Sequence, residues 1–115
     1  MDDLDALTSK EIFAAEIVRQ VGVPPERQTR AMKAGVKAGT ACFQAMDASN
    51  SEDETTKAGE ALDREMEAII AEEAALARLS VPESQVPRAK AIARLHFLIG
   101  MEMAYRQLSP STEDE

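Results

Sequence analysis

Helix-start signals divide this chain into four segments and constrain its fold more than any other feature. The capping-box spacing, in which a hydroxyl and a carboxylate satisfy the free amides of a helix start, stands ahead of two expected helices: at Thr8 with Glu11 and at Ser51 with Glu54. Prolines suited to the first turn of a helix stand at Pro25 and Pro87. In the first segment, apolar side chains recur at helical spacing on one face: Phe13, Ala14, Ile17, Val18 and Val21. We expect helices near residues 9–21, 25–48, 52–79 and 87–108.

The residues available for a core also favour helices. Hydrophobic residues make up 44% of the 115, but with three Phe, one Tyr and no Trp the core must consist of Ala, Leu, Ile, Met and Val. Short connections make neighbouring helices antiparallel. We therefore expect an all-α fold, a small antiparallel bundle of about four helices that homodimerisation could complete. It forms a single domain over residues 1–108, followed by a disordered acidic tail over residues 109–115.

The charges separate along the chain. Residues 17–48 carry five bases and two acids, a net charge of +3, whereas residues 49–77 carry nine acids and two bases, a net charge of -7. Antiparallel packing would place these complementary segments side by side. Bases at helical spacing form one stripe: Arg27, Arg30, Lys33 and Lys37. Because the whole chain has a net charge of -8 and no aromatic residues interleave with this stripe, nucleic-acid binding is disfavoured.

Cysteine usage and the amino-terminal residues bear on the compartment. Cys42 is the single cysteine and cannot form an internal disulfide, and residues 1–5 are acidic where a signal peptide would be basic. The longest apolar stretch, residues 91–105, is interrupted by charged residues and is shorter than the roughly 20 residues that span a bilayer. We expect a cytoplasmic protein that does not enter a membrane.

Patterns of catalytic or metal-binding residues are absent from the sequence. It has no glycine-rich phosphate loop, no His-Glu-x-x-His or Cys-x-x-Cys motif, and one histidine. Four acids could offer oxygen ligands, but on a helix rich in Ala and Glu such acids usually form a solvated face: Glu65, Glu67, Glu72 and Glu73. We predict no enzymatic activity, no cofactor and no metal site.

Gly35 and Gly39 lie four residues apart on one face of the helix expected over residues 25–48. A glycine in the middle of a helix costs up to about 1 kcal/mol relative to alanine. Close approach of another helix would compensate for this cost. The approaching helix could belong to the same chain, which we favour, or to a second copy. In both cases Gly39→Leu is expected to be disruptive.

The last expected helix has two apolar surfaces. Its broad inner face combines seven residues: Ala89, Ile92, Ala93, Phe97, Ile99, Gly100 and Met103. On the opposite side Leu98, Met101 and Tyr105 lie beside Arg94. A helix that is apolar nearly all round is either central in its bundle or covered by another chain. We favour the second alternative, so the four residues of this second side are predicted to form a partner or dimer interface.

Two ionisable side chains stand on apolar faces, Glu73 on the third expected helix and His96 on the fourth. Both would be costly to bury alone. In an antiparallel hairpin they lie about 9 Å and about 13 Å from the loop end, at 1.5 Å per residue. Our hypothesis is a hydrogen-bonded pair of Glu73 and His96. The alternative is that the backbone or water satisfies His96.

Together these features predict a small acidic regulatory protein that binds a protein partner and sequesters or inhibits it. The most testable form is an antiactivator that blocks the dimer surface of a transcription factor. A homodimeric scaffold or assembly module, and a secretion-type chaperone, are the alternatives. A nucleic-acid-binding module is disfavoured because the net charge is negative.

Overall fold

The computed structural model describes residues 7–108, and over this range it contains four α-helices, two short 3-10 helices and no strand. The α-helices are α1 (Ser9–Val21), α2 (Arg30–Ala48), α3 (Glu52–Ala77) and α4 (Val86–Leu108). The predicted all-α helical bundle is confirmed. The acidic tail expected over residues 109–115 lies outside the described residues. Among the helices described, none has the length and apolar content that crossing a membrane requires.

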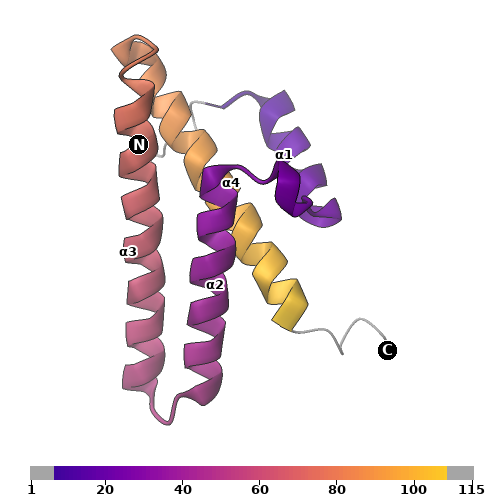
Figure 1. Cartoon of the computed structure of the whole chain (residues 1–115), viewed down its shortest axis with the longest axis vertical. Coiled ribbons are helices and arrows are strands. Elements are labelled where there is room, and N and C mark those ends of the chain that lie inside the picture. Colours follow the sequence, from indigo (N-terminus) through magenta and orange to yellow (C-terminus); the bar gives the residue numbers. More distant parts are fainter. Residues whose placement is uncertain (1–6, 109–115) are drawn as a thin grey trace.

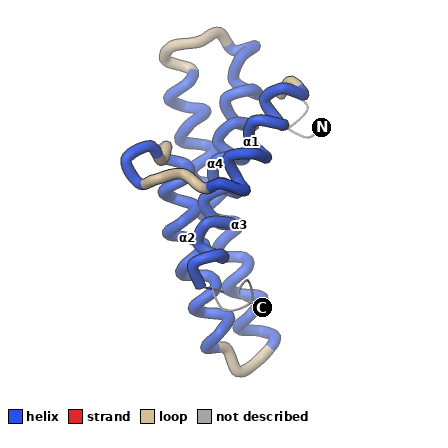
Figure 2. Tube along the Cα trace, turned by 90° about the vertical axis from the view of Figure 1, so that its right-hand side faces the viewer, coloured by secondary structure: helices blue, strands red, loops and turns tan. Residues whose placement is uncertain are grey.

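α2 and α3 run antiparallel and side by side, and α4 crosses behind α2 (Figure 1). α1 lies against α4, on the side away from α3; in the view turned by 90° it stands in front of α4 (Figure 2). The core forms where α2, α3 and α4 meet, from six buried residues: Ala31, Ala38, Ile69, Ile70, Ala93 and Phe97. Phe97 is the one large side chain that is fully buried among the described residues, and three of the six core residues are alanines.

Both expected capping patterns occupy helix starts. At α1 the Thr8 hydroxyl accepts a hydrogen bond from the Glu11 amide at 3.2 Å, and the Glu11 carboxylate accepts one from the Thr8 amide at 2.9 Å. At α3 the Ser51 hydroxyl accepts from the Glu54 amide at 3.2 Å. The Glu54 carboxylate accepts from the amide of Asn50, one residue earlier than a capping box requires, at 2.7 Å.

α2 begins at Arg30, not at Pro25 as expected. Pro25 opens a 3-10 helix that ends at Arg27, and the next two residues are extended. The Thr29 hydroxyl then accepts a hydrogen bond from the amide of Met32 at 3.3 Å and caps the helix. Threonine is a good N-cap, whereas Pro24 has no side chain that could satisfy the amides of a longer helix. As a result Arg27, the first residue of the predicted basic stripe, lies outside α2.

Candidate functional site

Three glycines let α2 and α4 cross at close range. A methyl group built on Gly35 would lie less than 3.0 Å from the carbonyl oxygen of Phe97, and one on Gly100 would lie as close to a backbone carbonyl of α2. Side-chain carbons essentially never approach other atoms so closely, so only glycine fits at these two positions. Gly39 is less tight, because its added methyl would lie 3.2 Å from the Cα of Met101. The helix that approaches Gly35 and Gly39 is therefore α4 of the same chain.

The four residues of α4 that were predicted as an interface, Arg94, Leu98, Met101 and Tyr105, are called the α4 stripe here, and the structure divides them. Met101 is partly buried and packs against the core. Tyr105 is 47% exposed and contacts Phe43 of α2, with 5.1 Å between ring centroids, while Leu98 is 38% exposed. Arg94 forms a 3.8 Å ion pair with a glutamate of α3. Because α1, α2 and α3 all contact α4, its central position accounts for two apolar sides without a second chain. An interface on this stripe stays a prediction.

His96 has a different partner from the one predicted. Its Nδ1 atom lies 3.0 Å from the hydroxyl of Thr29, the residue that caps α2, and Glu73 lies 3.9 Å from Arg30 instead. Burial lowers the pKa of His96 below its ordinary value, and the charge of nearby Glu73 acts in the opposite direction. The expected hydrogen bond between Glu73 and His96 is thus replaced by an electrostatic interaction. Nothing in the sequence relates Thr29 to His96, which stands 67 residues later.

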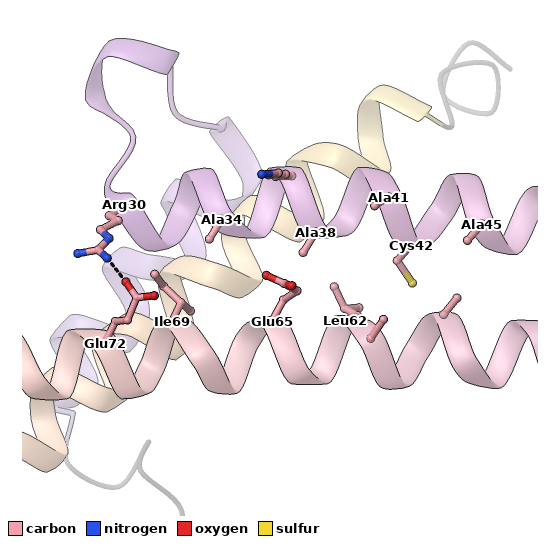
Figure 3. Close-up of a pocket in the computed structure, with 13 residues that line it drawn as sticks. Arg30, Ala34, Ala38, Ala41, Cys42, Ala45, Leu62, Glu65, Ile69 and Glu72 are labelled. Carbon is pink, nitrogen blue, oxygen red and sulfur yellow. Dashed lines mark hydrogen bonds and ion pairs between the residues drawn. The ribbon is translucent and has the colours of Figure 1, made fainter.

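An open groove with a volume of about 650 Å³ runs between α2 and α3 (Figure 3). On α2, small side chains point towards α3: Ala34, Ala38, Ala41, Cys42 and Ala45. The side chains of α3 that line it are Ala58, Ala61, Leu62, Glu65, Ile69 and Glu72. Methyl groups do not fill the space between the two helices, so an apolar channel remains open. The four alanines of α2 are spaced by four, three and four residues. This spacing is typical of the face on which one helix packs against another, and it is the signal in the sequence that could have located the groove.

The two rims of this groove have opposite charge. Arg30 and Lys37 line the α2 side, and Glu65 and Glu72 line the α3 side. Arg30 and Glu72 form an ion pair across one end (Figure 3). On the floor lies Cys42, and burial raises the pKa of its thiol, with the charge of an aspartate on α3 acting in the same direction.

Polar contacts attach α1 to α4. Arg88 donates a hydrogen bond to the carboxylate of Glu11 over 2.6 Å, and Arg106 donates one to the carbonyl oxygen of Gln20 over 2.7 Å. The hydrogen bonds from Arg88 and from the Thr8 amide lower the pKa of Glu11 to about 2. No residue of α1 itself is buried. The position of α1 therefore depends on arginines at the two ends of α4 more than on a shared apolar core.

The outer side of α1 carries three exposed apolar side chains, Phe13, Ile17 and Val21, which we call the α1 ridge. They are 67%, 47% and 80% exposed. Helical spacing predicted that they share one face with Val18, but Val18 lines a hollow of about 390 Å³ between α1 and α4, and none of the three ridge side chains lines it. The apolar face is divided because α1 packs chiefly against one helix, which covers only a narrow strip.

Comparison of the chain with protein-family models, curated proteins and solved structures finds no match. Within residues 7–108, no three His, Cys, Asp or Glu side chains are grouped so that they could hold a metal ion. Among the described residues, the α1 ridge and the groove between α2 and α3 are two apolar surfaces open to solvent.

Proposed function

We propose that this protein is a small acidic cytoplasmic regulator that binds another protein through the α1 ridge and blocks a surface which that partner needs. The exposure of Phe13 and Val21 carries the proposal. A contiguous row of large apolar side chains in water is unusual for a monomer and marks a site of interaction. The four-residue spacing of the ridge is the anchor pattern of a helix that docks into an apolar groove.

The chemistry of the ridge indicates what kind of partner it would take. Apolar side chains presented by a helix fit an apolar surface that the partner normally covers with its own helix, as at the dimer surface of a transcription factor. A net charge of -8 favours association with a basic partner such as a DNA-binding protein. An antiactivator would present α1 in place of the second subunit and keep the partner monomeric.

The exposed members of the α4 stripe belong to the same proposal as a second contact. Leu98 and Tyr105 retain accessible apolar area, and tyrosine is often an anchor at interfaces. Both residues lie on α4, the helix against which α1 packs.

The test compares Phe13→Glu with the control Leu79→Glu. Both changes replace an exposed apolar side chain with an acid, and Leu79, which follows α3, is 84% exposed. The wild type is used to capture partners from host lysate, and the dissociation constant of each purified partner is then measured by calorimetry. We expect Phe13→Glu to weaken binding at least tenfold with unchanged helicity, and Leu79→Glu to bind as the wild type does. Equal binding by both variants would refute the proposal.

A homodimeric scaffold or assembly module is the second candidate, and the groove between α2 and α3 favours it. The groove uses residues of α2 and α3, whereas the ridge lies on α1. One chain can therefore associate with its own copy on one surface and with a different protein on the other. A secretion-type chaperone would use the same ridge to shield an apolar helix of its cargo.

A further inference from the structure

We infer that the groove between α2 and α3 is an interface between two copies of this chain. The pair of helices is half of a four-helix bundle: they run antiparallel, α4 covers one of their faces, and the other face is open (Figures 1 and 3). The inference uses residues of α2 and α3 and does not rest on the function proposed for the α1 ridge.

The open face has the shape that a helix seam requires. Ala34, Ala38, Ala41 and Ala45 follow one another at the spacing of a coiled-coil stripe along the α2 side of the groove. Side chains this small allow helix axes to approach to about 8 Å, the lower end of the usual range. The α2 side of the groove therefore leaves room for the side chains of a helix from a second copy.

Charge identifies the occupant as a second copy. Residues 17–48 carry a net charge of +3 and residues 49–77 a net charge of -7. A two-fold axis parallel to the helices places α2 of one copy opposite α3 of the other, so the basic rim meets the acidic rim twice. A two-fold axis perpendicular to the helices would set α3 against α3, so that the Glu65 and Glu72 rims of the two copies face each other. Like charges that face each other are destabilising, so the parallel axis is favoured.

The register of the hairpin matches this arrangement. The ion pair of Arg30 with Glu72 fixes the register between α2 and α3. Because the helices are antiparallel, Lys37, seven residues after Arg30, lies level with Glu65, seven residues before Glu72. A two-fold axis parallel to the helices preserves these levels. Lys37 of one copy therefore stands opposite Glu65 of the other. Both side chains are exposed in the single chain.

The resulting dimer leaves α1 accessible, because no residue of α1 lines the groove among the residues described. Each dimer would present two α1 ridges. A binding partner that is itself dimeric could then engage both ridges, and the second contact would form at a high effective concentration.

The decisive experiment reverses the two rim charges in separate chains. Lys37→Glu and Glu65→Lys are each examined by size-exclusion chromatography with light scattering at low salt, beside the wild type. We expect the wild type at twice the chain mass of 12.5 kDa and each variant to dimerise at least tenfold more weakly. An equimolar mixture should recover the dimer, because each reversed charge then meets an opposite charge in the other chain.

The mixture separates contacts between copies from effects within one chain. Positions 37 and 65 of a single chain keep the same sign in either variant, so mixing changes nothing within the chain. A wild type that stays monomeric at 100 μM, on the order of the upper end of typical transient affinities, would overturn the inference. Failure of the mixture to recover the dimer would also overturn it.

A steric variant provides an independent test. Ala41→Trp places a large side chain in the groove, and Ala71→Trp places the same side chain on an exposed part of α3 outside it. We expect the first variant to be monomeric, with the circular dichroism of the wild type, and the second to remain a dimer. A dimer that tolerates Ala41→Trp must use another surface, such as the α1 ridge, and would contradict the inference.

Discussion

α2 presents small residues on two sides, and the chain closes only one of them. On the closed side, Gly35 and Gly39 bring the backbone of α2 against the backbone of α4. On the open side, Ala38 and Ala41 border a groove of about 650 Å³. The difference lies in the residue type: glycine is required where two backbones touch, whereas alanine leaves room for the side chains of an approaching helix. The glycine side is an internal crossing, and the alanine side is available to another chain.

The largest effect is expected from Gly35→Leu on the closed side. The new side chain would start less than 3.0 Å from the carbonyl oxygen of Phe97, and a backbone atom of a packed helix cannot move aside. We expect a loss of about 3 kcal/mol or more in the free energy of unfolding, measured by urea denaturation. Gly39→Leu should cost less, because the nearest backbone atom to its Cβ is 3.2 Å away.

Ala41→Leu on the open side is the matched control for this comparison. It adds the same side chain to the same helix at an exposed position. We expect its free energy of unfolding to stay within about 0.5 kcal/mol of the wild type at a concentration where the protein is monomeric. Equal destabilisation by the two leucines would mean that the sides of α2 do not differ as described.

A smaller effect of opposite sign is expected at Gly59 of α3. A methyl group added there meets nothing within 4 Å, so this glycine has no close neighbour to accommodate. Gly59→Ala should raise the free energy of unfolding by about 0.5–1 kcal/mol, because alanine favours the helix. The same change at Gly100 should be destabilising. A loss of stability at Gly59 would show that an open position also requires glycine.

The smallest expected effect is the titration of His96, which contacts the capping residue of α2. Since burial lowers the pKa of His96 below the ordinary value of 6.5, the unfolded chain binds the proton more readily than the folded protein. Its contribution to stability is therefore fully present above pH 6.5 and is lost as the pH falls through the lower pKa of the folded protein.

Proton NMR of the His96 ring measures this pKa directly. Glu73→Gln should lower it further, because the charge of Glu73 acts to raise it. A pKa that is unchanged in this variant would remove Glu73 from the surroundings of His96. A pKa above that of a free histidine would contradict the burial seen here.

The helices could be predicted from the sequence because local chemistry specifies them. Capping residues at Thr8 and Ser51 mark the starts of α1 and α3. The start of α2 was predicted wrongly, because Pro25 suits the first position of a helix whereas Thr29 suits the N-cap, and the helix uses the cap at Thr29.

The arrangement of surfaces was less predictable, because it depends on which helices meet. The spacing of Gly35 and Gly39 indicates a close crossing, but the facing residue, Gly100, is recognisable only when α4 is in place. Phe13 and Ile17 share the apolar pattern of α1 with Val18, and periodicity alone cannot reveal that a single neighbouring helix covers only part of that face. The partner of His96 likewise depends on a contact between residues distant in the sequence.

The attachment of α1 by arginines has a consequence for the order in which the protein opens. Without a buried side chain of its own, α1 can detach and its amides can exchange with deuterium while those of α2 and α4 stay protected. The ion pair of Arg88 with Glu11 needs an ionised Glu11, so its contribution is fully present above pH 4.5 and is lost as the pH falls towards about 2. Acidification should therefore release the amino-terminal helix as a separate kinetic unit before the glycine crossing separates.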